Sequence, residues 1–170
     1  MSSKPRRMTY LLIAIPTILL AGIAVVVVLS HRPVELGLVE GKLRPCPEKP
    51  NCVCSTATDE EHAIAALTLR GDDALGAFAE LVALTEGMDG ARVVEVGATY
   101  AHFAFTTPIL HFQDDLELHL DPATGQAQVR SSSRVGHSDL GANRKRVEAL
   151  RTDWDALQSS VPGTPGDSDQ

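Results

Sequence analysis

A run of 22 residues without a charged side chain stands near the start of the chain and constrains how the rest can fold. The run extends from Met8 to Leu29, MTYLLIAIPTILLAGIAVVVVL. As an α-helix it would span roughly 30 Å, the hydrocarbon thickness of a bilayer. The alternative is a cleaved signal peptide, whose apolar region is usually about 7–15 residues. This run is longer, and neither an A-x-A-like site nor a lipid-accepting cysteine follows it, so we expect an uncleaved transmembrane anchor over residues 8–29.

The charges on either side of this run predict its orientation. Lys4, Arg6 and Arg7 precede it, whereas the chain from His31 onward has 12 Lys and Arg against 22 Asp and Glu, a net charge of −10. Basic residues ahead of a transmembrane helix favour a cytoplasmic N-terminus. We therefore expect a single-pass protein of the inner (plasma) membrane, with residues 1–7 in the cytoplasm and an acidic body in the periplasm. An acidic body also argues against nucleic acid as a partner.

Beyond the anchor, composition divides the chain into three parts. Residues 30–42 show no sustained hydrophobic period and are predicted to be a tether. Residues 43–158 form the extracytoplasmic domain. The segment from residue 159 to 170, SSVPGTPGDSDQ, is polar and rich in Pro and Gly, which predicts a disordered tail.

A proline-rich loop, RPCPEKPNCVCS, opens the domain and contains all three cysteines. Its prolines remove amide donors, so we expect a fixed loop rather than helix or sheet. In an oxidising compartment Cys46 and Cys52 are predicted to form a disulfide, which leaves Cys54 reduced or scrambled. The alternative is a zinc site built from these thiols and His62, but the spacing matches no usual zinc pattern. We predict no metal and no cofactor.

The hydrophobic periods downstream predict an α+β domain of β-α-β-β-β-β-α order. A strand at 62–67 precedes a helix that is capped by Asp72 or Asp73 and ends at Gly87. Strands follow at 91–97 and 99–107, then a hairpin at 111–134 with the loop PATG. The last helix begins near Leu140, with Ser138 or Asp139 as its cap. Consecutive short strands without crossover helices favour an antiparallel sheet, with the helices packed on one face.

The register of the hairpin follows from its side chains. Pairing Asp121 with Gln126 places Ala127 and Val129 on the face shared with Leu116, Leu118 and Leu120. The same register sets Asp114 opposite Ser133 and Leu116 opposite Ser131 on the inward face. It sets Glu117 opposite Arg130 on the outward face, where we expect an ordinary exposed ion pair worth under about 1 kcal/mol. An inward Asp114 needs partners, and Arg134, Arg144 or backbone amides of the last helix are the nearest candidates.

The segment from Arg130 to Arg146, RSSSRVGHSDLGANRKR, is the densest cluster of arginine and small polar residues in the chain. The stripe Leu140, Val147, Leu150, Trp154 and Leu157 predicts the buried face of the last helix, and Asn143 falls within it. Two interpretations remain open. The polar groups either tie the start of the helix to the proline-rich loop or form a binding site.

Two long motifs, PCPEKPNCVCS and VRSSSRVGHSDLGANRKR, resemble those of the domain-of-unknown-function family 1499 of bacteria and plants. The resemblance covers about Leu43 to Leu157. It brings no established activity, cofactor or fold. The family usually has serine where this chain has Cys54, which argues against a Cys54 nucleophile. The matching positions are Pro45, Cys46, Pro47, Pro50, Asn51, Cys52, Ser55, Asp114, Asp115, Glu117, Arg130, Ser131, Ser133, Arg134, Gly136, Asp139, Gly141, Asn143, Arg144 and Arg146.

These observations favour a non-enzymatic, membrane-anchored binding or envelope accessory module, with an envelope protein or a small anionic ligand as partner. The predicted binding residues are Asp114, Arg130, Ser131, Ser133, Arg134, Asp139, Asn143, Arg144 and Arg146. The alternative is a hydrolase that uses Asp114, Asp139, His137 and the nearby serines. No nucleophile elbow, metal pair or Gly-rich phosphate loop supports it, so we assign no catalytic residue. A passive spacer is a third class.

Overall fold

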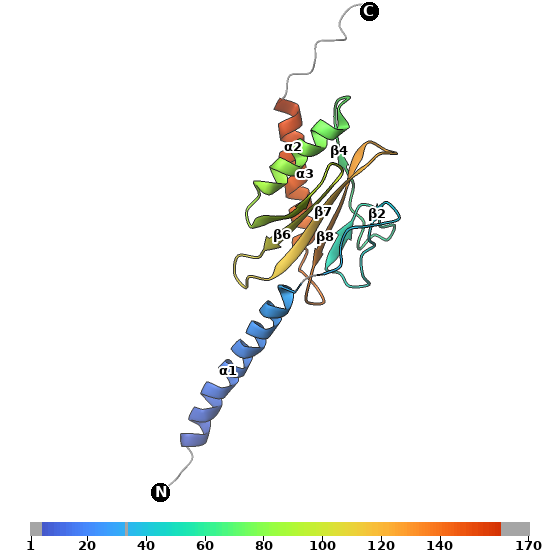
Figure 1. Cartoon of the computed structure of the whole chain (residues 1–170). Coiled ribbons are helices and arrows are strands. Elements are labelled where there is room, and N and C mark those ends of the chain that lie inside the picture. The colour runs from blue at the N-terminus through green and yellow to red at the C-terminus, as the bar shows by residue number, and fades with distance from the viewer. Residues whose placement is uncertain (1–4, 33, 161–170) are drawn as a thin grey trace, which may run out of the picture.

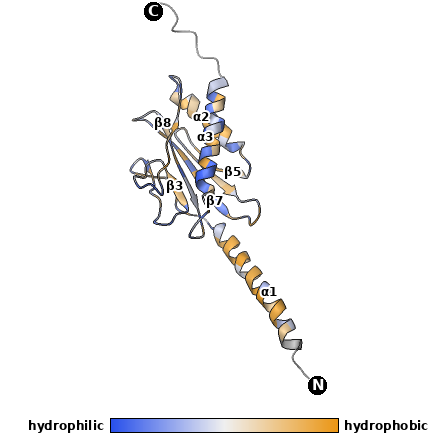
Figure 2. Cartoon of the chain, turned by 180° about the vertical axis from the view of Figure 1, so that it is seen from behind, coloured by the Kyte–Doolittle hydropathy of each residue, from blue (hydrophilic) through white to orange (hydrophobic). Residues whose placement is uncertain are grey.

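The computed structural model describes residues 5–32 and 34–160, with side chains from residue 8 onward. Helix α1 (Pro5–Ser30) contains the apolar run, and its segment Met8–Ser30 is long and apolar enough to cross a membrane. None of that segment's most apolar window is buried against the rest of the protein. Figures 1 and 2 show it as a separate, hydrophobic helix that projects from one end of the folded body.

The body is built on a six-stranded antiparallel sheet with the order β3-β8-β7-β6-β5, in which β4 also pairs with β8. The strands are β3 (Cys52–Cys54), β4 (Leu67–Thr68), β5 (Ala91–Val96), β6 (Tyr100–Thr106), β7 (Gln113–Asp121) and β8 (Gln126–Ser133). A separate two-stranded sheet is formed by β1 (Leu38–Val39) and β2 (Lys42–Leu43). The α+β class and the antiparallel pairing predicted from the sequence are confirmed.

Helices α2 (Ala74–Glu86) and α3 (Ala142–Ser160) cover one face of the sheet, as predicted, and share one core with it. Asp73 caps α2 by accepting a hydrogen bond from Gly76 N, and Gly87 ends it. The two helices and the sheet contribute buried side chains to this core. Those of the helices are Phe78, Leu81, Val82, Val147, Leu150 and Trp154, and those of β6, β7 and β8 include Phe103, Phe105, Leu116, Leu118 and Val129. Burying each of these side chains contributes roughly 1.5–3 kcal/mol before conformational entropy is counted.

The β7–β8 hairpin has the predicted register. Asp121 pairs with Gln126, Leu118 with Val129, Leu116 with Ser131 and Asp114 with Ser133. Leu116, Leu118 and Val129 are fully buried in the core, so the requirement that both strands turn their apolar residues to one face determines the alignment.

Two of the predictions about strands are wrong. The predicted strand at 62–67 is reduced to a bridge between Ala63 and Cys54 and to β4, which begins at Leu67. The cysteine loop, predicted to lie outside the sheet, contributes β3, because the chain after Pro50 pairs with β8. In addition, the segment predicted to be a tether contains β1 and the first residue of β2. β1 pairs with β2, and β2 lies against β7 and β8.

The ends of α3 also differ from expectation. The helix begins at Ala142, two residues after the predicted start, and Leu140 is 89% exposed rather than part of the buried stripe. At its C-terminal end, α3 continues to Ser160, so the first two residues of the predicted tail are helical. The remainder of that tail, residues 161–170, lies outside the described residues.

The second face of the sheet carries charged residues and is nevertheless buried. Glu117 and Arg130 pair there at 2.9 Å, with side chains 0% and 8% exposed. The prediction of an exposed, weak pair is therefore wrong. The reason is that the segment after α1 packs over this face, and Gly37 N donates to Glu117 Oε1 at 2.7 Å. Burial removes the screening by water that makes surface pairs weak.

Candidate functional site

The start of α3 positions the polar cluster. Leu140 and Gly141 both adopt left-handed backbone conformations, with φ of 55° and 79°. This turn lets Asp139 reach forward, so that Oδ1 accepts from Gly141 N at 2.9 Å and Oδ2 from Asn143 N at 2.7 Å. Asp139 thus has the capping role predicted for it, and its carboxylate serves backbone amides.

Asn143 is the centre of the network and is completely buried. Its Oδ1 accepts from Ser131 Oγ at 2.7 Å and from Arg146 Nη1 at 2.6 Å. Its Nδ2 lies 2.9 Å from Ser133 Oγ and 3.0 Å from the carbonyl oxygen of Asn51. One amide therefore joins α3 to both the end of β8 and the proline-rich loop. The position of Asn143 on the buried stripe is confirmed.

The inward carboxylate of Asp114 is paired with Arg146. Nη2 of Arg146 lies 2.6 Å from Asp114 Oδ2, and the guanidinium stacks over Phe105 at 4.7 Å from the ring centre. The prediction that Arg134 or Arg144 supplies the hydrogen-bonding partner is wrong. The cause is geometric, since Arg146 follows Asn143 by three residues and lies over the same stretch of β7 and β8.

Arg134 lies on the other face of the sheet and binds Asp115. Its Nε and Nη2 donate to the two carboxylate oxygens at 2.8 and 2.7 Å, and His102 Nε2 lies 2.7 Å from Oδ1. Burial alone raises the pKa of Asp115, but the hydrogen bonds from His102 and Arg134 outweigh burial and hold that pKa below its usual value of 3.8. His102 itself is buried.

Arg130 belongs to a second buried group on this face. Glu117, its partner, also accepts from Tyr100 Oη at 2.8 Å. Burial, followed by the charge of Glu117, raises the pKa of Tyr100 well above its usual range. The strand period alone predicts Asp115, Glu117 and Tyr100 to be outward residues. The hairpin register also marked Glu117 as the partner of Arg130, and the positions shared with the family include Asp115 and Glu117 but not Tyr100.

Arg144 has a separate role. Its Nη1 and Nη2 donate to the carbonyl oxygens of Ala63 and Glu61 at 2.8 and 3.0 Å. Arg151, further along the same helix, donates in the same way to Ala66 and Ala65 at 2.8 and 2.6 Å. The two arginines fasten the irregular segment before β4 to α3, a role that the sequence did not indicate.

The predicted binding residues therefore form two groups and one isolated residue. Asp114, Ser131, Ser133, Asp139, Asn143 and Arg146 meet on the helix-covered face, Arg130 and Arg134 lie on the opposite face, and Arg144 binds a neighbouring loop. Each of the four guanidinium groups has a partner within the protein. The cluster thus has the arrangement of an internal network.

The geometry does not bring together the groups that a hydrolase needs. His137 is exposed, and among the described residues neither Ser131 nor Ser133 is hydrogen-bonded to an imidazole. Both hydroxyls bond to Asn143 instead. A serine nucleophile requires a base within hydrogen-bond reach, so this arrangement does not favour the hydrolase alternative.

The cysteine chemistry follows the prediction. Cys46 and Cys52 form a disulfide, and Cys54 is free and buried, with its thiol 3.2 Å from Thr56 Oγ1. His62 is occupied elsewhere, with Nδ1 2.6 Å from Asp59 and Nε2 3.1 Å from the carbonyl oxygen of Lys49. Within residues 5–32 and 34–160 no group of three metal-ligating side chains converges, and the zinc alternative therefore finds no ligand set there.

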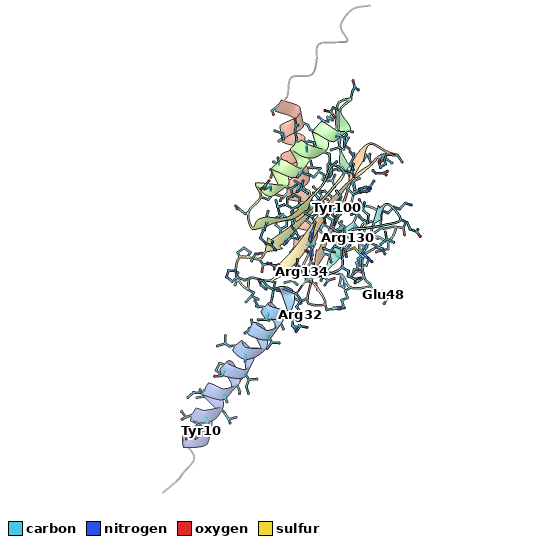
Figure 3. The ribbon with its side chains drawn as sticks, viewed as in Figure 1. Tyr10, Arg32, Glu48, Tyr100, Arg130 and Arg134 are labelled. Carbon is cyan, nitrogen blue, oxygen red and sulfur yellow. A yellow bond between two sulfur atoms is a disulfide. The ribbon has the colours of Figure 1, made fainter. Side chains whose placement is uncertain are left out.

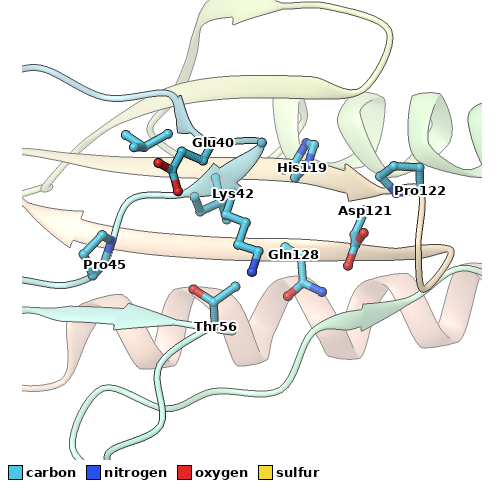
Figure 4. A pocket seen from close by; sticks show the side chains of 11 residues that line it. Glu40, Lys42, Pro45, Thr56, His119, Asp121, Pro122 and Gln128 are labelled. Atoms are coloured by element: carbon cyan, nitrogen blue, oxygen red, sulfur yellow. The ribbon is translucent and has the colours of Figure 1, made fainter.

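A cleft lies between the β1–β2 pair and the turn end of the hairpin (Figure 4). Its volume is about 610 Å³, and polar side chains from three segments border it: Glu40, Lys42, Thr56, His119, Asp121 and Gln128. His119 is anchored by a contact of 3.0 Å between its Nδ1 and the carbonyl oxygen of Thr99. The side chains of Lys42 and Glu40, both exposed, have neither a hydrogen bond nor an ion pair in the described structure. The cleft thus offers the free polar groups that the arginine cluster lacks.

Comparison with known proteins identifies the domain. A family model described as "Protein of unknown function (DUF1499)" matches residues 42–154, which include the cysteine loop, the hairpin and most of α3. No curated protein and no solved structure matches the chain. Since the matched region covers more than half of the chain, this protein belongs to the DUF1499 family.

Proposed function

We propose that this protein is a single-pass, membrane-anchored module that displays a non-enzymatic binding domain outside the cytoplasm. The apolar length of α1 supports the anchor, and the basic residues ahead of it support a cytoplasmic N-terminus. The Cys46–Cys52 disulfide supports an extracytoplasmic domain, because disulfides persist in oxidising compartments.

Within this proposal the arginine cluster is the scaffold and the cleft is the binding site. The contrast between their polar groups carries the proposal. Arg130, Arg134 and Arg146 are hydrogen-bonded to buried carboxylates, so an anionic ligand would have to break those pairs. The side chains of Lys42 and Glu40 have no partner to lose.

The lining of the cleft indicates the kind of ligand. Lys42 offers a cation, Glu40 offers an unpaired acceptor, and Leu43 and Pro45 supply apolar surface. Sites of this size with a few convergent polar groups are typical of small polar molecules or short peptide segments. A partner that presents an acidic group to Lys42 and a hydrogen-bond donor to Glu40 fits this pattern.

The experiment compares two exposed lysines in cells that lack the chromosomal copy of the gene. Lys42→Glu reverses the only free cation among the described residues that line the cleft, whereas Lys145→Glu makes the same change on the exposed side of α3. Both variants should retain the melting temperature of the wild type. We expect Lys42→Glu alone to fail to complement the deletion phenotype, and full complementation by Lys42→Glu would reject the cleft as the site.

Anchoring and orientation are tested separately. A periplasm-dependent enzyme fused after Gln170 should be active, and the full chain should resist extraction from membranes at alkaline pH. Activity of a cytoplasm-dependent reporter at the same position would contradict the proposed orientation and the redox argument.

A further inference from the structure

We infer that the end of the domain next to α1 rests on the outer surface of the membrane and inserts Ile109 and Leu140 into the lipid interface. This inference depends on the proposed membrane anchor and goes beyond it. The anchor alone requires only that the domain be connected to the bilayer, not that it touch the bilayer.

The first support is that α1 is fastened directly to the sheet. Ser30, the last residue of the helix, is fully buried, and its Oγ accepts from Gln113 N at 3.2 Å. Arg134 Nη1 donates to the carbonyl oxygen of Arg32 at 3.2 Å. Gln113 opens β7 and Arg134 follows β8, so the helix ends against the edge where these strands meet. This attachment limits how far the domain can move from the membrane surface.

The second support is the position of two loops that flank the attachment. Residues 107–112 lead into Gln113, and residues 135–141 follow Arg134. Both loops therefore lie at the end of the sheet where α1 joins it, as Figures 1 and 3 show. A membrane crossed by α1 would face this end.

The third support is what the two loops present. Ile109 is 87% exposed and Leu140 is 89% exposed, the two largest exposures among the large hydrophobic residues of the described structure, those of α1 included. Leu110 adds a third apolar side chain that is 42% exposed. Single exposed leucines are ordinary. Here the most exposed ones lie on both sides of the helix that leads into the bilayer.

The loops are also held in shape by hydrogen bonds. Thr107 N and Phe112 O lie 2.9 Å apart, and Thr107 Oγ1 accepts from Phe112 N at 2.9 Å, which closes the first loop at its base. Leu140 N donates to Ser138 Oγ at 3.2 Å, next to the capped start of α3. Ile109 and Leu140 are therefore presented on closed turns, which lowers the entropy lost on insertion.

Charge favours insertion over electrostatic adsorption. The chain after α1 has a net charge of −10, so anionic lipids repel the domain as a whole. At this end, however, Arg32, His111 and His137 are exposed and can lie among phosphate headgroups. Apolar side chains that insert beside polar groups and a cation such as Arg32 are typical of interfacial membrane contacts.

The test places tryptophan at the proposed contact in the full-length protein. Ile109→Trp and Leu140→Trp are reconstituted in vesicles of phosphatidylethanolamine and phosphatidylglycerol whose acyl chains carry a nitroxide quencher. Val96→Trp is the matched control, because Val96 is 52% exposed and pairs with Ala101 at the opposite end of the sheet. The native Trp154 is buried and provides a constant background.

We expect blue-shifted emission and quenching by the labelled lipid at positions 109 and 140, and neither effect at position 96. Equal emission and equal quenching at all three positions would overturn the inference. The inference would also be overturned if positions 109 and 140 were shielded from solvent in cells but not in vesicles, because a protein partner would then cover the loops. Extraction of the chain at alkaline pH would reject the anchor itself, so the two failures are distinguishable.

Discussion

Arg146 donates to Asp114 across 2.6 Å, from the second turn of α3 to the inward face of β7. This pair joins α3 to the central strand of the sheet. Both side chains are nearly buried, at 11% and 4% exposure, and Arg146 also bonds to Asn143 and Ser131. The pair is thus one part of a network that connects α3, β7 and β8.

Removing the cation should destabilise the domain strongly. Arg146→Ala leaves a buried carboxylate without its partner, so we expect the free energy of unfolding to fall by about 3–5 kcal/mol. Lys145→Ala, the adjacent exposed position, is the control and should change stability by less than about 0.5 kcal/mol. Urea unfolding in detergent measures both. An Arg146→Ala variant as stable as Lys145→Ala would show that the network contributes no stability.

Asn143 should be irreplaceable by a residue of similar size. Asn143→Leu roughly keeps the volume but leaves Ser133 Oγ without a partner and removes one hydrogen bond each from Ser131, Arg146 and the carbonyl oxygen of Asn51, so we expect a loss of about 2–4 kcal/mol. Asn143→Asp retains the acceptor for Arg146 but places a second carboxylate beside Asp139 and should also destabilise. Wild-type melting temperatures for both variants would contradict the central role of this amide.

Asp115 should make the domain sensitive to acid. Burial raises the pKa of this carboxyl, but hydrogen bonds from His102 and Arg134 outweigh burial and hold the pKa in the folded protein below the usual value of 3.8. The folded state therefore binds this proton less readily than the unfolded chain does. The stabilisation is present above the unfolded pKa and is lost as pH falls through the folded pKa.

Melting temperatures between about pH 7 and pH 2.5 test this linkage. The melting temperature of the wild type should fall below about pH 4. Asp115→Asn should have a lower melting temperature at pH 7 and a smaller further decrease over the same pH interval. Asp153→Asn, on the exposed surface of α3, is the control and should follow the wild-type profile. If the melting temperatures of Asp115→Asn and the wild type fell equally with pH, the acid sensitivity would come from other groups.

The disulfide should hold the proline-rich loop against β8. Replacing both Cys46 and Cys52 by alanine should lower stability by roughly 2 kcal/mol, the value expected for a short closed loop. Peptide mapping without reductant should recover the Cys46–Cys52 linkage. Cys54 should react with maleimide only after unfolding, because it is buried. A Cys46–Cys54 linkage in the native protein would contradict the structure.

The hairpin shows how far local pattern can predict tertiary contacts. Alternation along 113–121 and 126–133 is enough to predict the register, and the register turns Asp114 inward opposite Ser133. Helical phase likewise predicts that Asn143 lies on the buried stripe. Both results depend only on periods of 2 and 3.6 residues.

The partner of Asp114 could not be predicted in this way. The choice among Arg134, Arg144 and Arg146 depends on how α3 packs across the sheet. Leu140 and Gly141 adopt left-handed conformations, and the helix begins after them, at Ala142. The three-residue spacing puts Arg146 on the same side of α3 as Asn143, but the packing of the helix across β7 and β8 is what sets it beside Asp114.

Spacing along single segments was sufficient to predict the long apolar helix, the α+β order of the main elements, the disulfide and the inward polar positions. The burial of Glu117 and Arg130 has a different origin. Their alternation with core residues indicates the second face, but burial there depends on Gly37 and the β1–β2 pair, about 80 residues away in sequence. A face of a sheet is solvent-exposed or buried according to what packs on it, and no local period encodes that choice.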